Sequence, residues 1–425
     1  MAFAPLPWLL AAVGLYLLIR LRFFYFLHPR RSFGSAFSAL SSRENLRAFT
    51  IALAGTLGVG NVLGVASGLI IGGPGALFWI FISAIPASAL KYAEVLVASD
   101  VGRGGMAAAA RGSFPRFGRA LSVVYSLSCL ALAFVMGAAR QSRSVADSAE
   151  VALGIDGGIA AIVLCLIVFV SVLRGSETIG KITAIVIPLT TIVYIIIALS
   201  AIFTFIDRLP TVISLVINNA FDPAAGLGGV VSALNSKALR EGFARGMLSN
   251  EAGAGTSSLG HTSSGVLKSS VRALFGALEV FFDTSLLCTL SGLAILVSLP
   301  DLSAAEGGMQ LILSSLGSAL GSAAPIFVAL SVLAFAYSTV VCWYYYGTEC
   351  MTALSGRPSR LVFPVLFLSF VLLGGAISEG VLISLSDTLL FVLTLITLPT
   401  LIKNSDRIVT LSESNIKSKS KESDP

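Results

Sequence analysis

Residues 55–68 of the chain, GTLGVGNVLGVASG, decide its fold. They lie inside an apolar run long enough to cross a membrane, and yet they carry five glycines and one asparagine. Glycine tolerates non-helical backbone, and inside a bilayer the amides and carbonyls that a helix break frees need partners other than lipid. The stretch therefore raises the question of what interrupts a membrane helix at bilayer depth.

Two interpretations of these glycines compete. Gly60, Gly64 and Gly68 are spaced four residues apart, which suits close packing of membrane helices. The alternative is an unwound segment that presents its backbone to a ligand. Asn61 favours this alternative, because a buried amide needs hydrogen-bond partners that an ion or a substrate can supply.

The composition places the whole chain among integral membrane proteins. Of its 425 residues, 56% are hydrophobic and 12% are charged, and the mean hydropathy is +0.91. Apolar runs of about 20 residues, the length of a helix that spans the bilayer core, recur along the sequence. The runs are continuous rather than alternating, which predicts helices and not barrel strands.

We predict eleven membrane-spanning helices. The first belongs to an extra N-terminal segment, residues 1–30, and the other ten form two sets of five in residues 46–206 and 226–402. The seventh span is the least regular, since its apolar character lapses between Lys237 and Glu251, and we expect a broken helix there. The predicted spans are residues 4–27, 46–71, 75–99, 119–142, 157–173, 179–206, 226–262, 272–299, 323–347, 361–377 and 381–402.

Charge patterning predicts the orientation in a plasma membrane. Arginine and lysine concentrate in alternate loops, which we place in the cytoplasm, and the opposite loops carry acids such as Asp156, Asp301 and Glu306. We therefore expect the N-terminus outside. Residues 403–425 are polar and lack aromatic residues, which predicts a disordered cytoplasmic tail. The net charge of +6 follows from this topology and gives no reason to expect a nucleic-acid partner.

The remaining chemistry-bearing residues offer no catalytic site. The five cysteines lie within or at the ends of spans without ligand spacing, and His28 and His261 are expected at solvated helix ends. For Lys91, Glu94 and Asp283 we expect structural roles. No nucleophile–base pair or phosphate loop is evident, so the sequence argues against an enzyme.

Residues 245–258, RGMLSNEAGAGTSS, are the counterpart of the opening stretch in the second half of the chain. Interrupted segments at matching places in two halves indicate an inverted-repeat transporter, with discontinuous first and sixth core helices. Helix N-termini there suit a carboxylate and freed carbonyls suit a small cation, so an amino acid and Na⁺ would satisfy both. Glu251 is either the partner of a buried cation or part of an ion pathway.

Five stretches together carry a family resemblance: GVGNVLGVASGLIIGGPGALFW (58–79), GAARQSRSVADSAEVALGI (137–155), RGMLSNEAGAGTSS, FFDTSLLCTL (281–290) and FAYSTVVCWYYYG (335–347). They resemble the alanine or glycine:cation symporter family, sodium-coupled amino-acid transporters of the leucine-transporter-like fold in the amino acid-polyamine-organocation superfamily. The resemblance runs from about residue 14 to residue 401. It implies an all-α, polytopic protein with a 5+5 inverted repeat and one extra N-terminal helix.

The resemblance also implies a site. For Na⁺ it implies the carbonyls of Ala54 and Leu57 and the hydroxyls of Ser338 and Thr339, a set of hard oxygen ligands. No other cofactor is expected. The residues it implies for the substrate are Val59, Gly60, Asn61, Gln141, Leu248, Ser249, Asn250, Thr339 and Trp343.

The chain departs from the family pattern within this site. The family usually has Thr at the position of Val59 and Phe at that of Leu248, and it is usually less basic where Arg140 and Arg143 flank Gln141. These differences change the wall of the pocket more than the fold.

The sequence favours the import of a small neutral amino acid, alanine or glycine, together with Na⁺ by alternating access. Two alternatives stay open. One keeps the fold but couples to H⁺ through Glu251 or carries a different substrate. The other is an amino-acid sensor of the same fold that binds without transporting.

Overall fold

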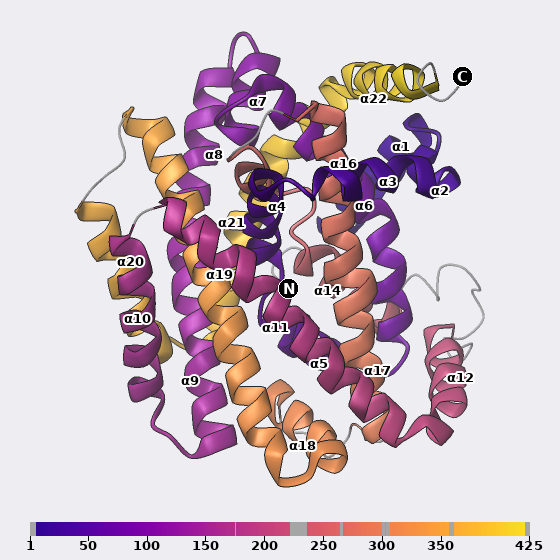
Figure 1. Ribbon diagram of the computed structural model, residues 1–425, viewed down its shortest axis with the longest axis vertical. Coiled ribbons are helices and arrows are strands. Elements are labelled where there is room, and N and C mark those ends of the chain that lie inside the picture. Colours follow the sequence, from indigo (N-terminus) through magenta and orange to yellow (C-terminus); the bar gives the residue numbers. More distant parts are fainter. Residues whose placement is uncertain are drawn as a thin grey trace.

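A computed structural model describes residues 6–174, 176–221, 236–263, 267–299, 302, 307–356 and 361–420. The predictions that fall on residues 226–235, Asp301 and Glu306 lie outside these residues. Every regular element in the described part is a helix (Figure 1).

The first half of the chain supplies the helices up to residue 204. They are α1 (Leu6–Arg20), α2 (Phe24–Leu27), α3 (Pro29–Ala39), α4 (Arg43–Thr56), η1 (Gly60–Gly64), α5 (Val65–Gly72), α6 (Ala76–Val101), α7 (Gly105–Ser113), α8 (Gly118–Leu132), η2 (Ala133–Ala139), α9 (Arg140–Leu153), α10 (Gly157–Leu173) and α11 (Ser176–Thr204).

The second half of the chain supplies the remaining helices, which are again both long and short. They are η3 (Ile206–Arg208), α12 (Leu209–Ala220), α14 (Lys237–Ser249), α15 (Ser258–His261), α16 (Ser269–Val280), η5 (Phe281–Cys288), α17 (Thr289–Ser298), α18 (Gly308–Leu320), η6 (Gly321–Ala323), α19 (Ala324–Ser355), α20 (Val362–Leu373), η7 (Gly374–Ala376), α21 (Glu379–Lys403) and α22 (Ser405–Ser420).

Most predicted spans coincide with long apolar helices. By length and composition, six continuous helical runs of the described chain can cross a membrane, and a seventh consists of α4 with η1–α5, bent by 46° at their break. Three shorter apolar helices, α1, α10 and α20 with η7, match the first, fifth and tenth predicted spans. The irregular seventh span is interrupted, as expected: α14 ends at Ser249 and α15 begins at Ser258.

The first span is shorter than predicted. Instead of continuing to residue 27, α1 ends at Arg20, because Arg22 and Phe23 adopt left-handed backbone with φ of 52° and 53°. Its 15 residues cover only about 22 Å along the helix axis. The helix is held against the bundle by a stacked contact of Trp8 with Phe243, whose ring centroids are 5.7 Å apart.

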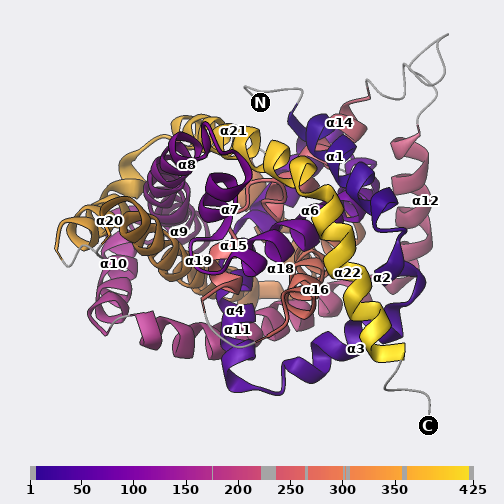
Figure 2. The ribbon, with the colours of Figure 1, turned by 90° about the horizontal axis from the view of Figure 1, so that it is seen from above.

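The prediction of a disordered tail is wrong for residues 405–420, which form α22. Figure 2 shows this helix extending past α6 and α16 at one end of the molecule. Ile408 is fully buried, Ser412 hydrogen-bonds the Tyr92 hydroxyl over 2.8 Å, and Arg407 pairs with Asp100. The buried isoleucine supplies the apolar face that makes this polar segment fold.

Helix α6 lies at the centre of one group of helices. Helices α1, α14 and α16 all pack along it, and the side chains between Ala87 and Ala98 are buried throughout. On the other side of the molecule α19 runs beside α8, η2 and α9 (Figure 1). The two interrupted segments lie between these groups and position the site.

The close approach of α1 to α6 can be tested by a substitution at Gly14. A Cβ atom at Gly14 would lie 2.4 Å from the Pro86 carbonyl oxygen, whereas one at Gly34 in α3 would meet nothing within 4 Å. We expect Gly14→Ala to destabilise the protein by about 1–3 kcal/mol despite the higher helix propensity of alanine, and Gly34→Ala to be neutral or stabilising. Thermal unfolding in detergent micelles measures both, and equal melting temperatures would contradict this packing.

Candidate functional site

The first helix break leaves backbone groups without backbone partners. Between α4 and η1, the amides of Gly58, Val59 and Gly60 donate no backbone hydrogen bond, and the carbonyls of residues 54–57 accept none, among the described residues. The C-terminal end of α4 and the N-terminal end of η1 thus lie at one place. The free amides carry partial positive charge and the free carbonyls carry partial negative charge. An anion and a cation can be bound side by side here.

The second break is satisfied by the protein itself. Glu251, Gly253 and Gly255 adopt positive φ, which unwinds the chain after α14. The Gly253 amide donates to the Glu94 carboxylate over 2.5 Å, and the Ala254 carbonyl accepts from the hydroxyls of Tyr125 and Thr397, at 3.0 and 3.2 Å. Glu94 therefore fixes the unwound backbone, which agrees with the structural role we expected for it.

A buried carboxylate joins the two breaks. Asp283, fully buried in η5, accepts from the Asn61 side-chain amide over 2.7 Å and from the hydroxyls of Ser249 and Thr284 over 2.9 and 2.7 Å. Asn250 donates to the Thr284 hydroxyl over 2.9 Å. Sequence reasoning treated Asp283 as structural and missed that it connects both interrupted helices.

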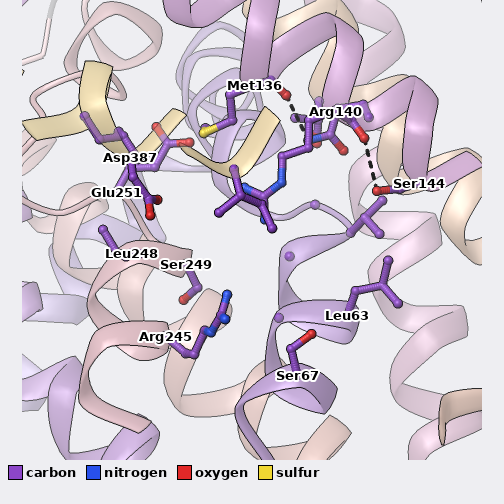
Figure 3. A pocket seen from close by; sticks show the side chains of 18 of the residues that line it. Leu63, Ser67, Met136, Arg140, Ser144, Arg245, Leu248, Ser249, Glu251 and Asp387 are labelled. Carbon is purple, nitrogen blue, oxygen red and sulfur yellow. Dashed lines mark hydrogen bonds between the residues drawn. The ribbon is translucent and has the colours of Figure 1, made fainter. Parts of the chain in front are cut away.

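A cavity of about 360 Å³ opens beside the first break (Figure 3). Its wall contains seven of the predicted site residues: Val59, Gly60, Gln141, Leu248, Ser249, Glu251 and Thr339. The other predicted residues are not part of this wall: Ala54, Leu57, Asn61, Asn250, Ser338 and Trp343.

The cavity answers the question that the opening glycines raised. A Cβ atom at Gly60 or Gly64 would meet nothing within 4 Å, since both residues face the cavity. Packing explains Gly68, where a Cβ would come within 3.3 Å of the Arg245 side chain. It also acts at Gly55 and Gly58, where a Cβ would come within 2.9 Å of a hydroxyl oxygen. The close-packing interpretation is therefore wrong for Gly60 and Gly64.

Thr339 brings an unpaired hydroxyl to the first break. Its Oγ1 is buried without a hydrogen-bond partner among the described residues, and it lies 2.9 Å from where a Cβ atom of Gly58 would be. Ser338 is fully buried, and its hydroxyl donates to the Phe335 carbonyl over 2.9 Å, which leaves its oxygen lone pairs available. Together with the free carbonyls of Ala54 and Leu57, these oxygens have the chemistry that Na⁺ prefers.

Trp343 lies behind the cavity wall. Its side chain is fully buried and fills the space that Gly137 leaves, where a Cβ atom would come within 2.2 Å of the tryptophan. Tyr346 packs against it edge-on, with ring centroids 5.4 Å apart, and is also fully buried. The ring therefore supports the wall from behind and is not exposed in it.

A second buried cluster lies at the C-terminal end of the second break. Lys91 donates to Glu279 over 3.1 Å and to the Ser257 hydroxyl over 2.7 Å, and His261 lies 2.8 Å from the other Glu279 oxygen. All three ionisable side chains are fully buried. The expected solvated position of His261 is thus wrong, because Glu279 offers it a partner that the sequence does not reveal.

Comparison with known proteins identifies the family. A family model described as the sodium:alanine symporter family matches residues 2–425. The chain belongs to this family. The sodium/alanine symporter AgcS of Methanococcus maripaludis is 29% identical over 90% of this chain and 87% of its own length. An uncharacterized transporter of Haemophilus influenzae is 30% identical, with the same coverage of both chains.

Solved structures confirm the predicted fold. A Na⁺-coupled sialic acid symporter in a substrate-bound outward-open state superposes with a TM-score of 0.56 at 13% identity, covering 97% of this chain and 87% of that one. The manganese transporter of Eremococcus coleocola gives 0.55 at 15% identity, over 87% of this chain and 76% of that one. This member of the sodium:alanine symporter family is therefore a multi-pass membrane transporter of the leucine-transporter-like fold, not an enzyme.

The pairing of Lys91 with Glu279 in the buried cluster can be tested by removing one of the two charges or both. We expect Lys91→Met to cost about 3–5 kcal/mol of unfolding free energy, because it leaves the buried Glu279 carboxylate with only His261 as a partner and without its lysine. Adding Glu279→Gln should recover part of this loss, since the glutamine keeps a partner for His261. The exposed Lys237→Met is the matched control and should shift stability by no more than about 0.5 kcal/mol. Denaturant unfolding in mixed micelles measures all three, and additive losses in the double variant would refute the pairing.

Proposed function

We propose that the protein imports a small neutral amino acid, alanine or glycine, together with Na⁺ across the plasma membrane. The observation that carries the proposal is the first helix break, where free amides and free carbonyls adjoin one cavity. An amino-acid carboxylate and a sodium ion are the pair of charges that such a break accommodates. The names of curated relatives, among them a sodium/alanine symporter, support the same pair.

The residues around the break support one orientation of the substrate. Its carboxylate would accept from the free amides at Gly58, Val59 and Gly60, which form the positive end of a helix. Its amine would donate to Gln141, whose Oε1 is buried without a partner in the described part of the chain. Leu248 would limit the side chain of the substrate, since it lines the same cavity.

For the ion we propose the carbonyls of Ala54 and Leu57 and the hydroxyls of Ser338 and Thr339. A sodium ion there would hold α4 against α19 and so favour the shape of the break that binds substrate. Because coupling is reciprocal, substrate would raise the affinity for Na⁺ by the same factor. The unpaired Thr339 hydroxyl is the most informative residue of this set.

We propose that the cavity leads to the outside of the cell, with the N-terminus outside and the C-terminus in the cytoplasm. Glu379 and Gly380, which line the cavity, begin α21, and the charge pattern assigns the loop before them to the external side. Alternating access would then close this route and open one on the cytoplasmic side.

Uptake of labelled alanine and glycine into proteoliposomes tests the function. We expect accumulation when an inward Na⁺ gradient is imposed and none with K⁺. An inside-negative potential should increase it, since each translocated charge contributes about 2.3 kcal/mol per 100 mV. Equal uptake in all three conditions would contradict sodium symport.

The ion site is tested by Thr339→Val, which keeps the shape of the side chain and removes the oxygen. We expect the sodium concentration for half-maximal uptake to rise roughly tenfold or more, because one ligand to a cation is lost. Thr348→Val, on the same helix but outside the cavity wall, should leave it unchanged, since its hydroxyl only bonds the Tyr344 carbonyl. Wild-type sodium dependence in the Thr339 variant would rule out this site.

Glu251 supports a second candidate, coupling to H⁺. It is the buried carboxylate of the cavity wall, its Oε2 accepts from the Thr256 hydroxyl over 2.6 Å, and a relative from Bacillus sp. is named a sodium/proton-dependent alanine carrier. If H⁺ is coupled, a pH gradient drives uptake in sodium-free buffer and Glu251→Gln abolishes that uptake. No uptake under a pH gradient in the wild type would exclude this candidate.

A further inference from the structure

Two arginines enter the substrate cavity from different helices. Arg140 begins α9, next to the pocket residue Gln141, and Arg245 lies on α14, one helical turn before Leu248. Figure 3 shows both side chains reaching into the cavity toward each other. Guanidinium groups at membrane depth are costly and mark a functional site when they face a water-filled cavity.

Neither guanidinium is neutralised by a close carboxylate. Arg140 makes no ion pair within the described residues. Arg245 makes only a long contact with a carboxylate, because its Nε lies 4.0 Å from Glu241. This Nε is buried without a hydrogen bond. By contrast Arg143, three residues after Arg140, is fully engaged: it pairs with Asp147 at 2.8 Å and donates to the Gly375 carbonyl over 2.8 Å.

The acidic groups of the cavity occupy a different part of its wall. Figure 3 shows Glu251 and Asp387 together, on another side from the two arginines, and Glu379 is exposed at the start of α21. Cationic and anionic side chains therefore line the same cavity, and the acids interact with the arginines through the cavity without forming a close ion pair with Arg140. A ligand that neutralises both needs an ammonium group and more than one carboxylate.

We propose that the substrates of this transporter include amino acids with an acidic side chain, whose second carboxylate binds Arg140 and Arg245. This rests on the proposed symport function and extends its substrate class. The α-carboxylate keeps its place at the free amides of the first break, and the ammonium group keeps its place at Gln141. The side-chain carboxylate then fills the space between the two guanidinium groups, which bind carboxylates through paired N–H donors.

The size and the wall of the cavity agree with a longer substrate. Its volume of about 360 Å³ is within the range of pockets that enclose ligands considerably larger than alanine. Small or aliphatic residues, Gly60, Gly64 and Val59, face the cavity on the side of the first break and leave this space open. Ser67 and Ser144 add hydroxyl groups to the same wall, so the extra space is polar.

The test compares labelled glutamate and aspartate with labelled alanine in the same proteoliposomes, under an inward Na⁺ gradient. We expect saturable, sodium-dependent uptake of the acidic amino acids. Arg140→Gln should lower the ratio of glutamate to alanine uptake about ten- to a hundredfold, the effect of losing one charged hydrogen-bond partner. Arg140→Lys, which keeps the charge without the paired donors, should fall between this variant and the wild type.

Arg143→Gln is the matched control. It removes the same charge three residues away, outside the cavity wall, so the ratio of glutamate to alanine uptake should stay unchanged even if total uptake falls. A second measurement uses the wild-type protein alone: in detergent with Na⁺, glutamate should raise its melting temperature, and alanine provides the comparison. This second readout holds even if the Arg140 variants fail to fold.

The outcomes separate this proposal from the proposed function. Sodium-driven uptake of alanine with neither uptake nor stabilisation by glutamate or aspartate would overturn the acidic substrate and leave the symporter intact. Equal losses of alanine and glutamate uptake in Arg140→Gln would also overturn it. Arg140 would then help the cavity to close and would not recognise the side-chain carboxylate of the substrate. No uptake of any of these amino acids and no stabilisation would overturn both.

Discussion

The structure depends on one constraint: backbone that leaves the helical conformation inside a membrane must still find hydrogen-bond partners. The two breaks meet this constraint in opposite ways. At the second, side chains from three other helices supply the partners, with the Glu94 carboxylate on the Gly253 amide and the Tyr125 hydroxyl on the Ala254 carbonyl. At the first, the partners are missing beside a cavity. One break is thereby part of the framework, and the other presents backbone groups that a ligand can pair with.

Much of the fold could be predicted because membrane helices are defined by local properties, namely length, hydropathy and glycine content. Nine of the ten later spans, the two breaks and the family all follow from short stretches of sequence, and the seventh predicted span, residues 226–262, lies partly outside the described residues. The exceptions have two causes, a local turn and a partner distant in the chain. Helix α1 ends early at a left-handed turn that no composition rule foresees, and α22 folds because Ile408 finds a buried place against the bundle. The boundaries of the two repeats stay a prediction.

The site residues could be predicted where the backbone or neighbouring positions in a helix place them. They were harder to predict where hydrogen bonds between distant side chains place them. Gly60 and Thr339 reach the cavity wall because their helices place them there. The resemblance also implied Trp343 as a wall residue, but Gly137 opens a space behind the wall that the ring fills. Asp283 was undervalued because two of its three donors, Asn61 and Ser249, come from segments distant in the sequence. Pairings of this kind are decided by tertiary structure and leave no local pattern.

Both described ends of the chain are attached to the same group of helices. Helix α1 packs along α6, and α22 contacts α1, α6 and α16, with Arg20 of α1 paired to Asp406 of α22. Any rocking of this group against α9 and α19 would therefore carry the two ends together. Their separation would stay constant through the transport cycle, while the distance from either end to α20, on the opposite side, would change. The terminal helices thus act as a fixed reference frame from which motion of the rest could be followed.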